Sequence, residues 1–156
     1  MSAQAAEMEA GLALRHAETT DELRRCFPLM RELRPHLPSA EVFVIRVRRQ
    51  AAAGYRLLAA WDGDRAVGLA GYRPQETLIR GAFCYVDDLV VAPEARRGGV
   101  GARLLDAVAA EAQGQGLPFL VLDTAIDNLF GQRFYFRYGM LPAALRFAMP
   151  IPEAQG

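Results

Sequence analysis

The sequence predicts a mixed α+β fold, with a central, mostly antiparallel sheet and helices on both of its faces. Apolar runs of strand length alternate with segments of helical spacing in the order β-α-α-β-β-β-α-β-α-β. An Asp62-Gly63 pair stands between two of the apolar runs, which is typical of a hairpin between antiparallel strands. Because no internal repeat or linker is visible, we expect one domain over residues 12–156. Residues 1–11, Ala-rich and acidic, are expected to be a loose leader.

The first part of the chain predicts a strand and two helices. Residues 12–17 can form the first strand. Thr19 and Glu22 are spaced as a capping box, which opens a helix. Ser39 can cap a second helix after two prolines interrupt the first.

The middle of the chain predicts three strands and a helix. The hairpin strands are expected at residues 55–61 and 66–72, and a longer strand at residues 79–91. That strand leads through a glycine-rich loop into a helix whose apolar face begins at Val100.

The end of the chain predicts two more strands and one more helix. Residues 119–123 are interpreted as a buried strand. Residues 128–138 are interpreted as a helix that Gly139 ends in a left-handed conformation, and residues 145–149 as the final strand.

Composition excludes several classes of protein. The chain is 52% hydrophobic and 23% charged, with 18 acidic and 18 basic residues, as in an ordinary globular protein. This disfavours disorder and nucleic-acid binding.

Cys26 and Cys84 lack metal-ligand spacing and are interpreted as reduced, partly buried thiols, so no metal is expected. No signal peptide or membrane-spanning run is visible, so we expect a cytoplasmic location and no membrane partner.

The run Arg96-Arg97-Gly98-Gly99-Val100-Gly101 lies between a predicted strand and a predicted helix. Backbone N–H groups converge at such a helix start, and the helix dipole adds positive potential there. The glycines let a bulky anion approach the main chain, and the two arginines can bind phosphate oxygens. A diphosphate fits this loop better than a single carboxylate.

Several readings of this loop compete with a coenzyme A pyrophosphate site. A P-loop is excluded because no Gly-Lys-Ser/Thr follows. A dinucleotide site is suggested by Gly99-x-Gly101 after a strand and by Asp123 downstream, but Leu104 stands where the third glycine belongs. A simple helix-opening turn is the remaining alternative.

Two motifs together identify a resemblance. Residues 91–101, Val-Ala-Pro-Glu-Ala-Arg-Arg-Gly-Gly-Val-Gly, are followed by Asn128-x-x-Gly131-x-x-Phe134-Tyr135-x-x-x-Gly139-Met140. In spacing and order they resemble the GNAT superfamily of acetyltransferases. Gly131 stands where the family usually has alanine, and Met140 where it usually has an aromatic residue. The resemblance is close over residues 85–141, and the preceding half matches in element order.

The resemblance implies a sheet splayed at a cofactor cleft and an acetyl-CoA co-substrate. Tyr135 would be the general acid near the thioester sulfur. The cofactor would be held by backbone groups of a strand, by the glycine loop, and by residues of the last helix, namely Leu89, Val90, Val91, Arg96, Arg97, Gly98, Gly99, Val100, Gly101, Ala102, Asn128, Phe134 and Arg137.

Amine acylation requires a base for the amine proton and a donor for the oxyanion. The candidate bases are Asp87, Asp88 and Asp123. Asp87 and Asp88 are adjacent on one strand, so alternation predicts opposite faces and at most one base. Each of the three is also a candidate structural carboxylate. His16 and His36 are isolated and receive no role.

The predicted function is acetyl-CoA-dependent N-acetylation of a primary amine on a small molecule or protein. The alternative is a noncatalytic acyl-CoA-binding sensor or interaction module. The sequence leaves open the acceptor, the acyl group, the base, and whether exposed strands support a homodimer.

Overall fold

The computed structural model describes residues 11–153, so the leader expected at residues 1–11 lies, apart from Gly11, outside the described residues. The chain divides after Leu122 into two compact units. Among the described residues, the first unit contains the sheet and three α-helices, and the second contains one α-helix and the C-terminal segment.

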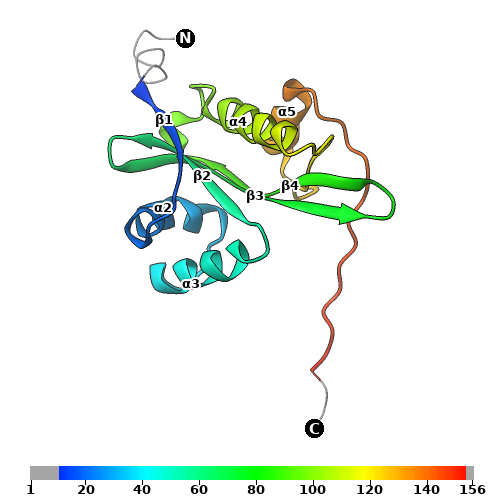
Figure 1. Ribbon diagram of the computed structural model, residues 1–156, viewed down its shortest axis with the longest axis horizontal. Coiled ribbons are helices and arrows are strands. Elements are labelled where there is room, and N and C mark those ends of the chain that lie inside the picture. Colours follow the sequence, from blue (N-terminus) through cyan, green and yellow to red (C-terminus); the bar gives the residue numbers. More distant parts are fainter. Residues whose placement is uncertain (1–10, 154–156) are drawn as a thin grey trace. The chain divides into compact units, whose positions relative to one another are not determined.

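The first unit is built on a five-stranded sheet (Figure 1). Its strands follow one another in the order β1-β2-β3-β4-β5. Neighbours are antiparallel except for β4 and β5, which are parallel. The mostly antiparallel sheet predicted from the sequence is therefore confirmed. The strands are β1 (Ala13–His16), β2 (Arg56–Asp62), β3 (Arg65–Thr77), β4 (Gly81–Val91) and β5 (Leu120–Leu122).

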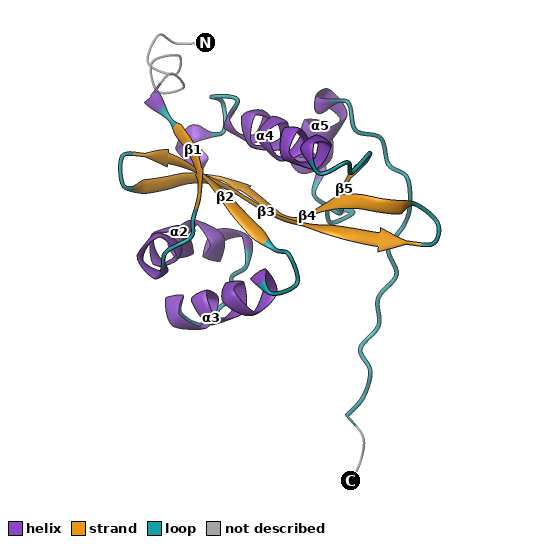
Figure 2. Ribbon diagram, in the orientation of Figure 1, coloured by secondary structure: helices purple, strands orange, loops and turns teal. Residues whose placement is uncertain are grey.

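Helices cover both faces of this sheet (Figure 2). Helices α2 (Thr20–Leu33) and α3 (Ala40–Ala51) lie on one face, and α4 (Val100–Gly114) lies on the other. A short 3-10 turn, η1 (Pro93–Ala95), precedes α4.

The capping box that opens α2 is confirmed. The Thr19 hydroxyl accepts from the Glu22 N–H at 3.1 Å, and the Glu22 carboxylate accepts from the Thr19 N–H at 3.0 Å. The backbone N–H groups of Thr19 and Glu18, with Arg15, hold the pKa of Glu22 at about 2. The Ser39 hydroxyl likewise caps α3 by accepting from the Val42 N–H.

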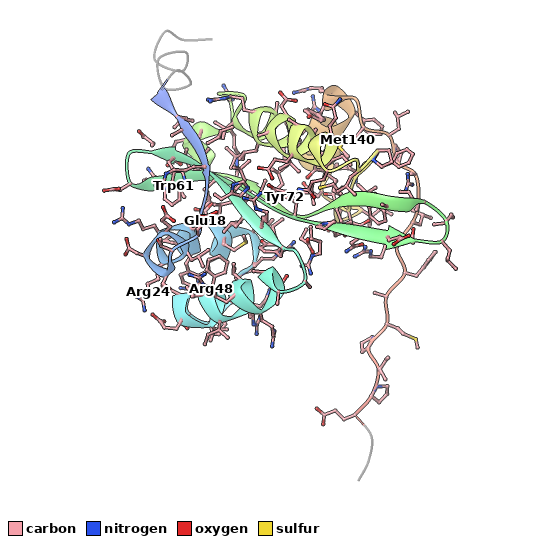
Figure 3. The ribbon with its side chains drawn as sticks, viewed as in Figure 1. Glu18, Arg24, Arg48, Trp61, Tyr72 and Met140 are labelled. Carbon is pink, nitrogen blue, oxygen red and sulfur yellow. The ribbon has the colours of Figure 1, made fainter. Side chains whose placement is uncertain are left out.

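The core lies between the sheet and its helices, and Trp61 is its largest fully buried side chain (Figure 3). Helix α4 approaches the sheet closely over Gly68. A Cβ atom there would lie 2.7 Å from Val100 and 2.9 Å from Leu104. The glycine therefore sets how closely the helix behind the glycine loop packs on the sheet.

Two strand predictions differ from the structure in extent. The second hairpin strand continues to Thr77, well past the predicted residue 72, because β4 pairs with its residues 68–77. The strand expected to be buried over residues 119–123 is shorter, and its three residues are only half-buried. It pairs with β4 over just three residues, from Cys84 to Val86.

The second unit contains α5 (Leu129–Tyr138). Asn128 caps its start, and Gly139, with φ of 100°, ends it as predicted. The final strand predicted at residues 145–149 is wrong for this chain, since those residues have no secondary structure. A strand requires a hydrogen-bonded neighbour, and the structure pairs none with this segment among residues 11–153.

Cys26 and Cys84 are free, fully buried thiols. Burial raises the pKa of Cys26 to about 12 and that of Cys84 to about 11. Within residues 11–153 no helix is long and apolar enough to span a bilayer. In the same range, no three His, Cys, Asp or Glu side chains gather in a way that could hold a metal ion.

Candidate functional site

A β-bulge in β4 shapes the centre of the sheet. Gly71 pairs with Asp88 and Tyr72 pairs with Val86, which leaves Asp87 as an extra residue on β4. Pairing between β4 and β5 also ends at Val86, while β4 runs on to Val91. β5 itself ends at Leu122, so the part of β4 from Asp87 to Val91 has no strand partner on that edge among residues 11–153. The splay that the resemblance implies stays a prediction.

The bulge breaks the alternation expected for Asp87 and Asp88. Both carboxylates join a single polar network on the face covered by α2 and α3, through Arg34, Tyr55 and Arg73. The expectation that these two side chains point to opposite faces is therefore wrong, because the extra residue resets the two-residue period.

Asp88 is held at both of its carboxylate oxygens. Arg34 Nε donates to Oδ1 at 2.9 Å, and the Tyr55 hydroxyl donates to Oδ2 at 2.8 Å. Arg34 also donates from Nη2 to the Asp87 carbonyl oxygen at 2.8 Å. Asp88 therefore fastens the end of α2 to the bulge, which is a structural role.

Asp87 is held at one oxygen only. Arg73 Nε donates to Oδ2 at 2.9 Å, and the same guanidinium lies 5.2 Å from the centre of the Tyr55 ring and bonds Gln50 of α3. Oδ1 has no hydrogen-bond partner among residues 11–153. Burial raises the pKa of the Asp87 carboxyl, against the lowering effect of Arg73. A half-buried carboxylate with one free oxygen and a raised pKa has the properties of a base.

Gly71 makes room for the contact between Tyr55 and Asp88. A Cβ atom at this position would overlap the Tyr55 hydroxyl and lie 2.8 Å from Asp88 Oδ2. We expect Gly71→Ala to lower the free energy of unfolding by about 1–3 kcal/mol, as overpacking does, in urea melts followed by circular dichroism. Gly114→Ala is the matched control, because a Cβ there meets nothing within 4 Å. Equal effects of the two substitutions would contradict this account.

The glycine loop forms an uncapped helix start. Gly99 adopts φ of 69° and is the N-cap of α4, and no side chain caps the helix. The Gly99 carbonyl accepts the first helical bond, from the Arg103 N–H at 3.0 Å. The N–H groups of residues 100–102 precede that first bond and are available to a ligand.

The residues of this loop fit a diphosphate. Arg96 and Arg97 are exposed beside the helix start, and Arg96 Nε donates to the Val91 carbonyl oxygen at 3.1 Å. This bond directs Arg96 along the end of β4 and leaves its terminal nitrogens free to bind an anion. A coenzyme A pyrophosphate requires unpaired backbone N–H donors, a glycine with positive φ and cationic side chains, and this loop provides all three.

Leu89, Val90 and Val91 pair with β3 on one edge, opposite Ala70, Leu69 and Gly68. Their other edge lies beyond the end of the β4–β5 ladder. Backbone groups of this stretch can therefore serve an extended ligand or an oxyanion.

In the second unit, Asn128 has a structural function that explains a departure from the family pattern. Its Oδ1 accepts from the Gly131 N–H at 3.0 Å, and its Nδ2 donates to Thr124 at 3.1 Å. A Cβ at residue 131 would lie 2.5 Å from Asn128 Nδ2. Glycine at this position makes room for the capping amide.

Tyr135 is half-buried on α5, with its ring 5.3 Å edge-on from that of Phe134. Burial raises the pKa of Tyr135, so its hydroxyl remains a proton donor at neutral pH. Arg137 is exposed on the same helix. Asp123 forms an ion pair with Arg146.

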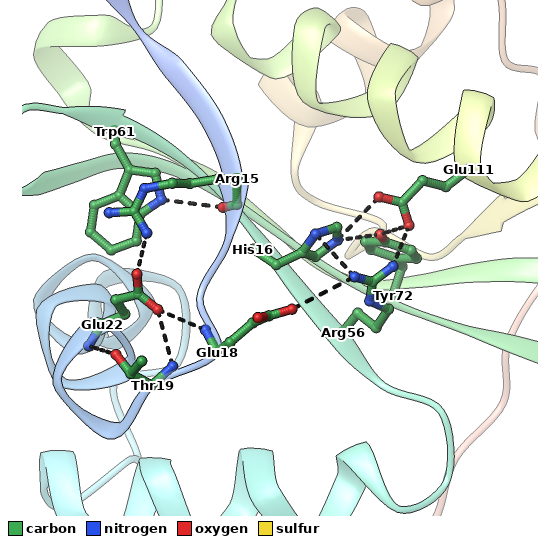
Figure 4. Close-up of polar contacts among 9 residues, drawn as sticks. All are labelled: Arg15, His16, Glu18, Thr19, Glu22, Arg56, Trp61, Tyr72 and Glu111. Atoms are coloured by element: carbon green, nitrogen blue, oxygen red, sulfur yellow. Dashed lines mark hydrogen bonds and ion pairs between the residues drawn. The ribbon is translucent and has the colours of Figure 1, made fainter.

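A second polar cluster lies on the opposite face of the sheet, where the sequence assigned His16 no role (Figure 4). His16 Nε2 lies 2.7 Å from the Tyr72 hydroxyl and 3.2 Å from Glu111 Oε1. Arg56 bonds Glu111 at 2.9 Å and approaches His16 Nδ1 at 3.2 Å. Because a guanidinium only donates, His16 Nδ1 accepts and the ring is neutral. The cluster ties α4 to strands β1, β2 and β3.

This cluster predicts a pH dependence of stability. Burial lowers the pKa of His16 below its ordinary 6.5, and Arg56 lowers it further, against Glu111 and Glu18. Folding therefore weakens proton binding, so the free energy of unfolding falls as pH drops from 6.5 towards the folded pKa. The decrease is at most about 1.4 kcal/mol per pH unit. We expect His16→Gln to flatten this slope in urea titrations; an unchanged slope would assign it to other groups.

The sequence patterns did not identify three residues of the site, namely Arg34, Tyr55 and Arg73. Arg34 is 54 residues from Asp88, so no local pattern connects them. The one available signal was Gly71, a glycine inside a strand pattern, which marks a bulge or a close approach.

Known proteins resemble this chain in sequence. The acetyltransferase (GNAT) family matches residues 16–140. The uncharacterized N-acetyltransferase YhdJ of Bacillus subtilis is 27% identical over 140 residues, covering 88% of this chain and 98% of that protein.

Solved structures agree in fold. Aminoglycoside N-acetyltransferase AAC(6')-Iy in complex with CoA has a TM-score of 0.78 and 18% identity, covering 92% of this chain and 95% of that chain. Aminoglycoside 6'-N-acetyltransferase AAC(6')-Ih of Acinetobacter baumannii has a TM-score of 0.77 and 19% identity, covering 91% and 100%.

Proposed function

Because the chain belongs to the GNAT acetyltransferase family, we propose that it transfers an acetyl group from acetyl-CoA to a primary amine of a small molecule or protein. The observation that carries this proposal is the uncapped start of α4 behind Gly99. It follows a strand whose outer edge is unpaired with β5 beyond Val86. A single catalytic domain over residues 12–156 is part of the proposal.

The donor is held by two sets of groups in the first unit. N–H groups of residues 100–102, together with Arg96 and Arg97, bind the pyrophosphate. Backbone groups of residues 89–91 bind the extended arm. When bound, acetyl-CoA supplies a thioester whose carbonyl carbon an amine can attack.

Asp87 is the proposed base. A primary amine with a pKa near 10 is mostly protonated at neutral pH, so it must lose a proton before it attacks. Asp88 has both oxygens bound, and Asp123 is paired with Arg146. Asp87 keeps one oxygen free. Of the three candidate aspartates, it is therefore the best suited to accept that proton.

The remaining proton and charge are assigned to two other groups. A backbone N–H within residues 89–91 stabilises the oxyanion, since that edge has no β5 partner. Tyr135 protonates the departing thiolate, because its hydroxyl has a raised pKa and keeps its proton. On α5 we also propose that Asn128, Phe134 and Arg137 contact the donor.

The structural neighbours support coenzyme A as the donor and an amine as the acceptor. AAC(6')-Iy has been solved with CoA and with the bisubstrate analog CoA-S-monomethyl-acetylneamine. At 18–19% identity these enzymes share the fold with this chain, so the proposed acceptor is a primary amine of unspecified structure.

Calorimetric titration with acetyl-CoA, followed by thiol release with a panel of amines, tests the proposal. The chain contains no lysine, so no side-chain amine of its own competes as an acceptor. Binding with amine-dependent release supports the transferase. Binding without release from any amine supports the noncatalytic sensor, and no binding overturns both.

A further inference from the structure

We propose that Gln50 of α3 is a positioning residue for the base. By accepting a hydrogen bond from Nη2 of Arg73, it keeps that guanidinium on one carboxylate oxygen of Asp87 and leaves the other oxygen for the acceptor amine. This role rests on the proposed function, in which Asp87 takes the amine proton. Gln50 reaches Asp87 through Arg73, so it positions the base without touching it.

The contact between Arg73 and Asp87 uses one prong of a possible two. An arginine beside a carboxylate often binds both oxygens, through two parallel N–H groups on one edge of the guanidinium. Nε and Nη2 form such an edge. Here Nε donates to Asp87 Oδ2 at 2.9 Å, but Nη2 donates to the side-chain oxygen of Gln50. Gln50 therefore engages the nitrogen that would otherwise complete a two-pronged contact with Asp87.

Gln50 is held in place for this contact by the residues that follow it. Its backbone carbonyl oxygen accepts from the Ala53 N–H at 2.9 Å and from the Tyr55 N–H at 3.1 Å. The buried Tyr55 ring then lies against Arg73, whose Cζ is 5.2 Å from the ring centre, as a cation–π contact. The turn between α3 and β2 thus fixes both the hydrogen-bond acceptor and the aromatic platform of the guanidinium.

The neighbouring Asp88 provides the contrast. Its side chain is 15% exposed and that of Asp87 is 22% exposed, so burial distinguishes the two carboxylates little. Their partners do distinguish them. Asp88 has an oxygen bound by Arg34 and the other bound by the Tyr55 hydroxyl, whereas Asp87 has the single contact that Gln50 leaves to Arg73.

The open oxygen decides how well Asp87 accepts a proton. An N–H bond of the acceptor ammonium breaks, an O–H bond forms at Oδ1, and the electron pair stays on nitrogen for attack on the thioester. A second hydrogen bond to the carboxylate would favour its charged form and make it a weaker base. The charged and titratable groups that face Asp87 are Arg73 of β3, Asp88 of β4, Arg34 of α2 and the Tyr55 hydroxyl.

Two substitutions of Gln50 test this role through the pH profile of amine-dependent thiol release. Gln50→Leu removes the acceptor, so Arg73 can bind both oxygens of Asp87. We expect kcat to fall by about tenfold to a hundredfold, as misplacement of a reacting group does. The acidic side of the profile should move to lower pH, and the Kd for acetyl-CoA should stay unchanged.

Gln50→Glu is the conservative variant. It still accepts from Nη2, so the highest kcat should return towards that of the wild type. Its negative charge raises the pKa of a neighbouring carboxyl, so the acidic side of the profile should move to higher pH. A role in folding alone would not move the profile in opposite directions. Gln113→Leu is the matched control and should change neither quantity, because Gln113 is exposed near the end of α4, on the opposite face of the sheet.

Carbon-13 NMR titration of the Asp87 carboxyl carbon tests the contact without turnover, and Asp87→Asn identifies its signal. We expect the pKa of Asp87 to fall in Gln50→Leu and to rise in Arg73→Gln, with circular dichroism as in the wild type. An unchanged pKa in Gln50→Leu overturns the proposal, as does an unchanged kcat in an active chain. If the pKa changes as expected but the wild type releases no thiol with any amine, the contact stands and the proposed function is wrong.

Discussion

Asp87→Asn is expected to lower kcat by about 10²–10⁴, the usual contribution of a general base, while the Kd for acetyl-CoA stays unchanged. Asn cannot accept the amine proton, yet it is isosteric and can still accept the bond from Arg73. Because burial raises the pKa of Asp87, the charged form is disfavoured in the folded protein. The substitution should therefore not lower the melting temperature.

Asp88→Asn is the matched comparison and should have the opposite effects. It removes a charge that Arg34 and Tyr55 hold at both oxygens. The free energy of unfolding should fall by about 1–3 kcal/mol, as for hydrogen bonds to charged groups. Activity per folded molecule should change much less. If Asp88→Asn abolished turnover in a stable protein while Asp87→Asn did not, the assignment of the base would be reversed.

The pH profile provides a second check on Asp87. The base must be ionised, so kcat should fall as pH drops through a pKa above the ordinary 3.8 of aspartate. The effect on folding stability has the opposite sign. A carboxyl whose pKa is raised in the folded protein stabilises the fold below pH 3.8, and this stabilisation is lost as pH rises through the folded pKa. Asp87 thus supports activity in the pH range where it does not support folding.

Local patterns predicted the parts of the fold that depend on neighbours in sequence. The Thr19–Glu22 capping box, the hairpin turn and the Gly139 cap each act within a few residues, so the sequence alone identifies them. The turn lies one residue later than predicted, at Gly63 and Asp64, because Asp62 still pairs with Arg65. The glycine loop is local in the same sense, because its N–H donors, its glycines and its arginines are consecutive.

The parts that could not be predicted depend on long-range pairing. The bulge at Asp87 exists only in register with Gly71, and it decides which face each aspartate occupies. Arg34 reaches Asp88 from the far end of α2. The C-terminal segment was mispredicted in the other direction: its alternation is that of a strand, but no strand within residues 11–153 pairs with it.

Arg96→Glu is expected to weaken acetyl-CoA binding by about tenfold to a hundredfold, a loss of roughly 1.4–2.8 kcal/mol. It replaces a cation beside the uncapped start of α4 with an anion, which repels the pyrophosphate. Gly99→Trp should weaken binding at least as much, because φ of 69° strains any other residue and the ring would cover the N–H donors. Calorimetry measures both Kd values.

Arg48→Glu provides the charge-matched control for this test. Arg48 is exposed on α3, which covers the opposite face of the sheet from α4 (Figure 2). If binding depended only on net charge, Arg48→Glu and Arg96→Glu would weaken acetyl-CoA binding equally, and high salt should reduce the weakening in both variants. A site built from directed N–H donors predicts a loss confined to the loop variants, with kcat at saturating acetyl-CoA nearly unchanged in Arg96→Glu. If Arg96→Glu and Gly99→Trp both kept the wild-type Kd for acetyl-CoA, the assignment of the pyrophosphate site to this helix start would be wrong.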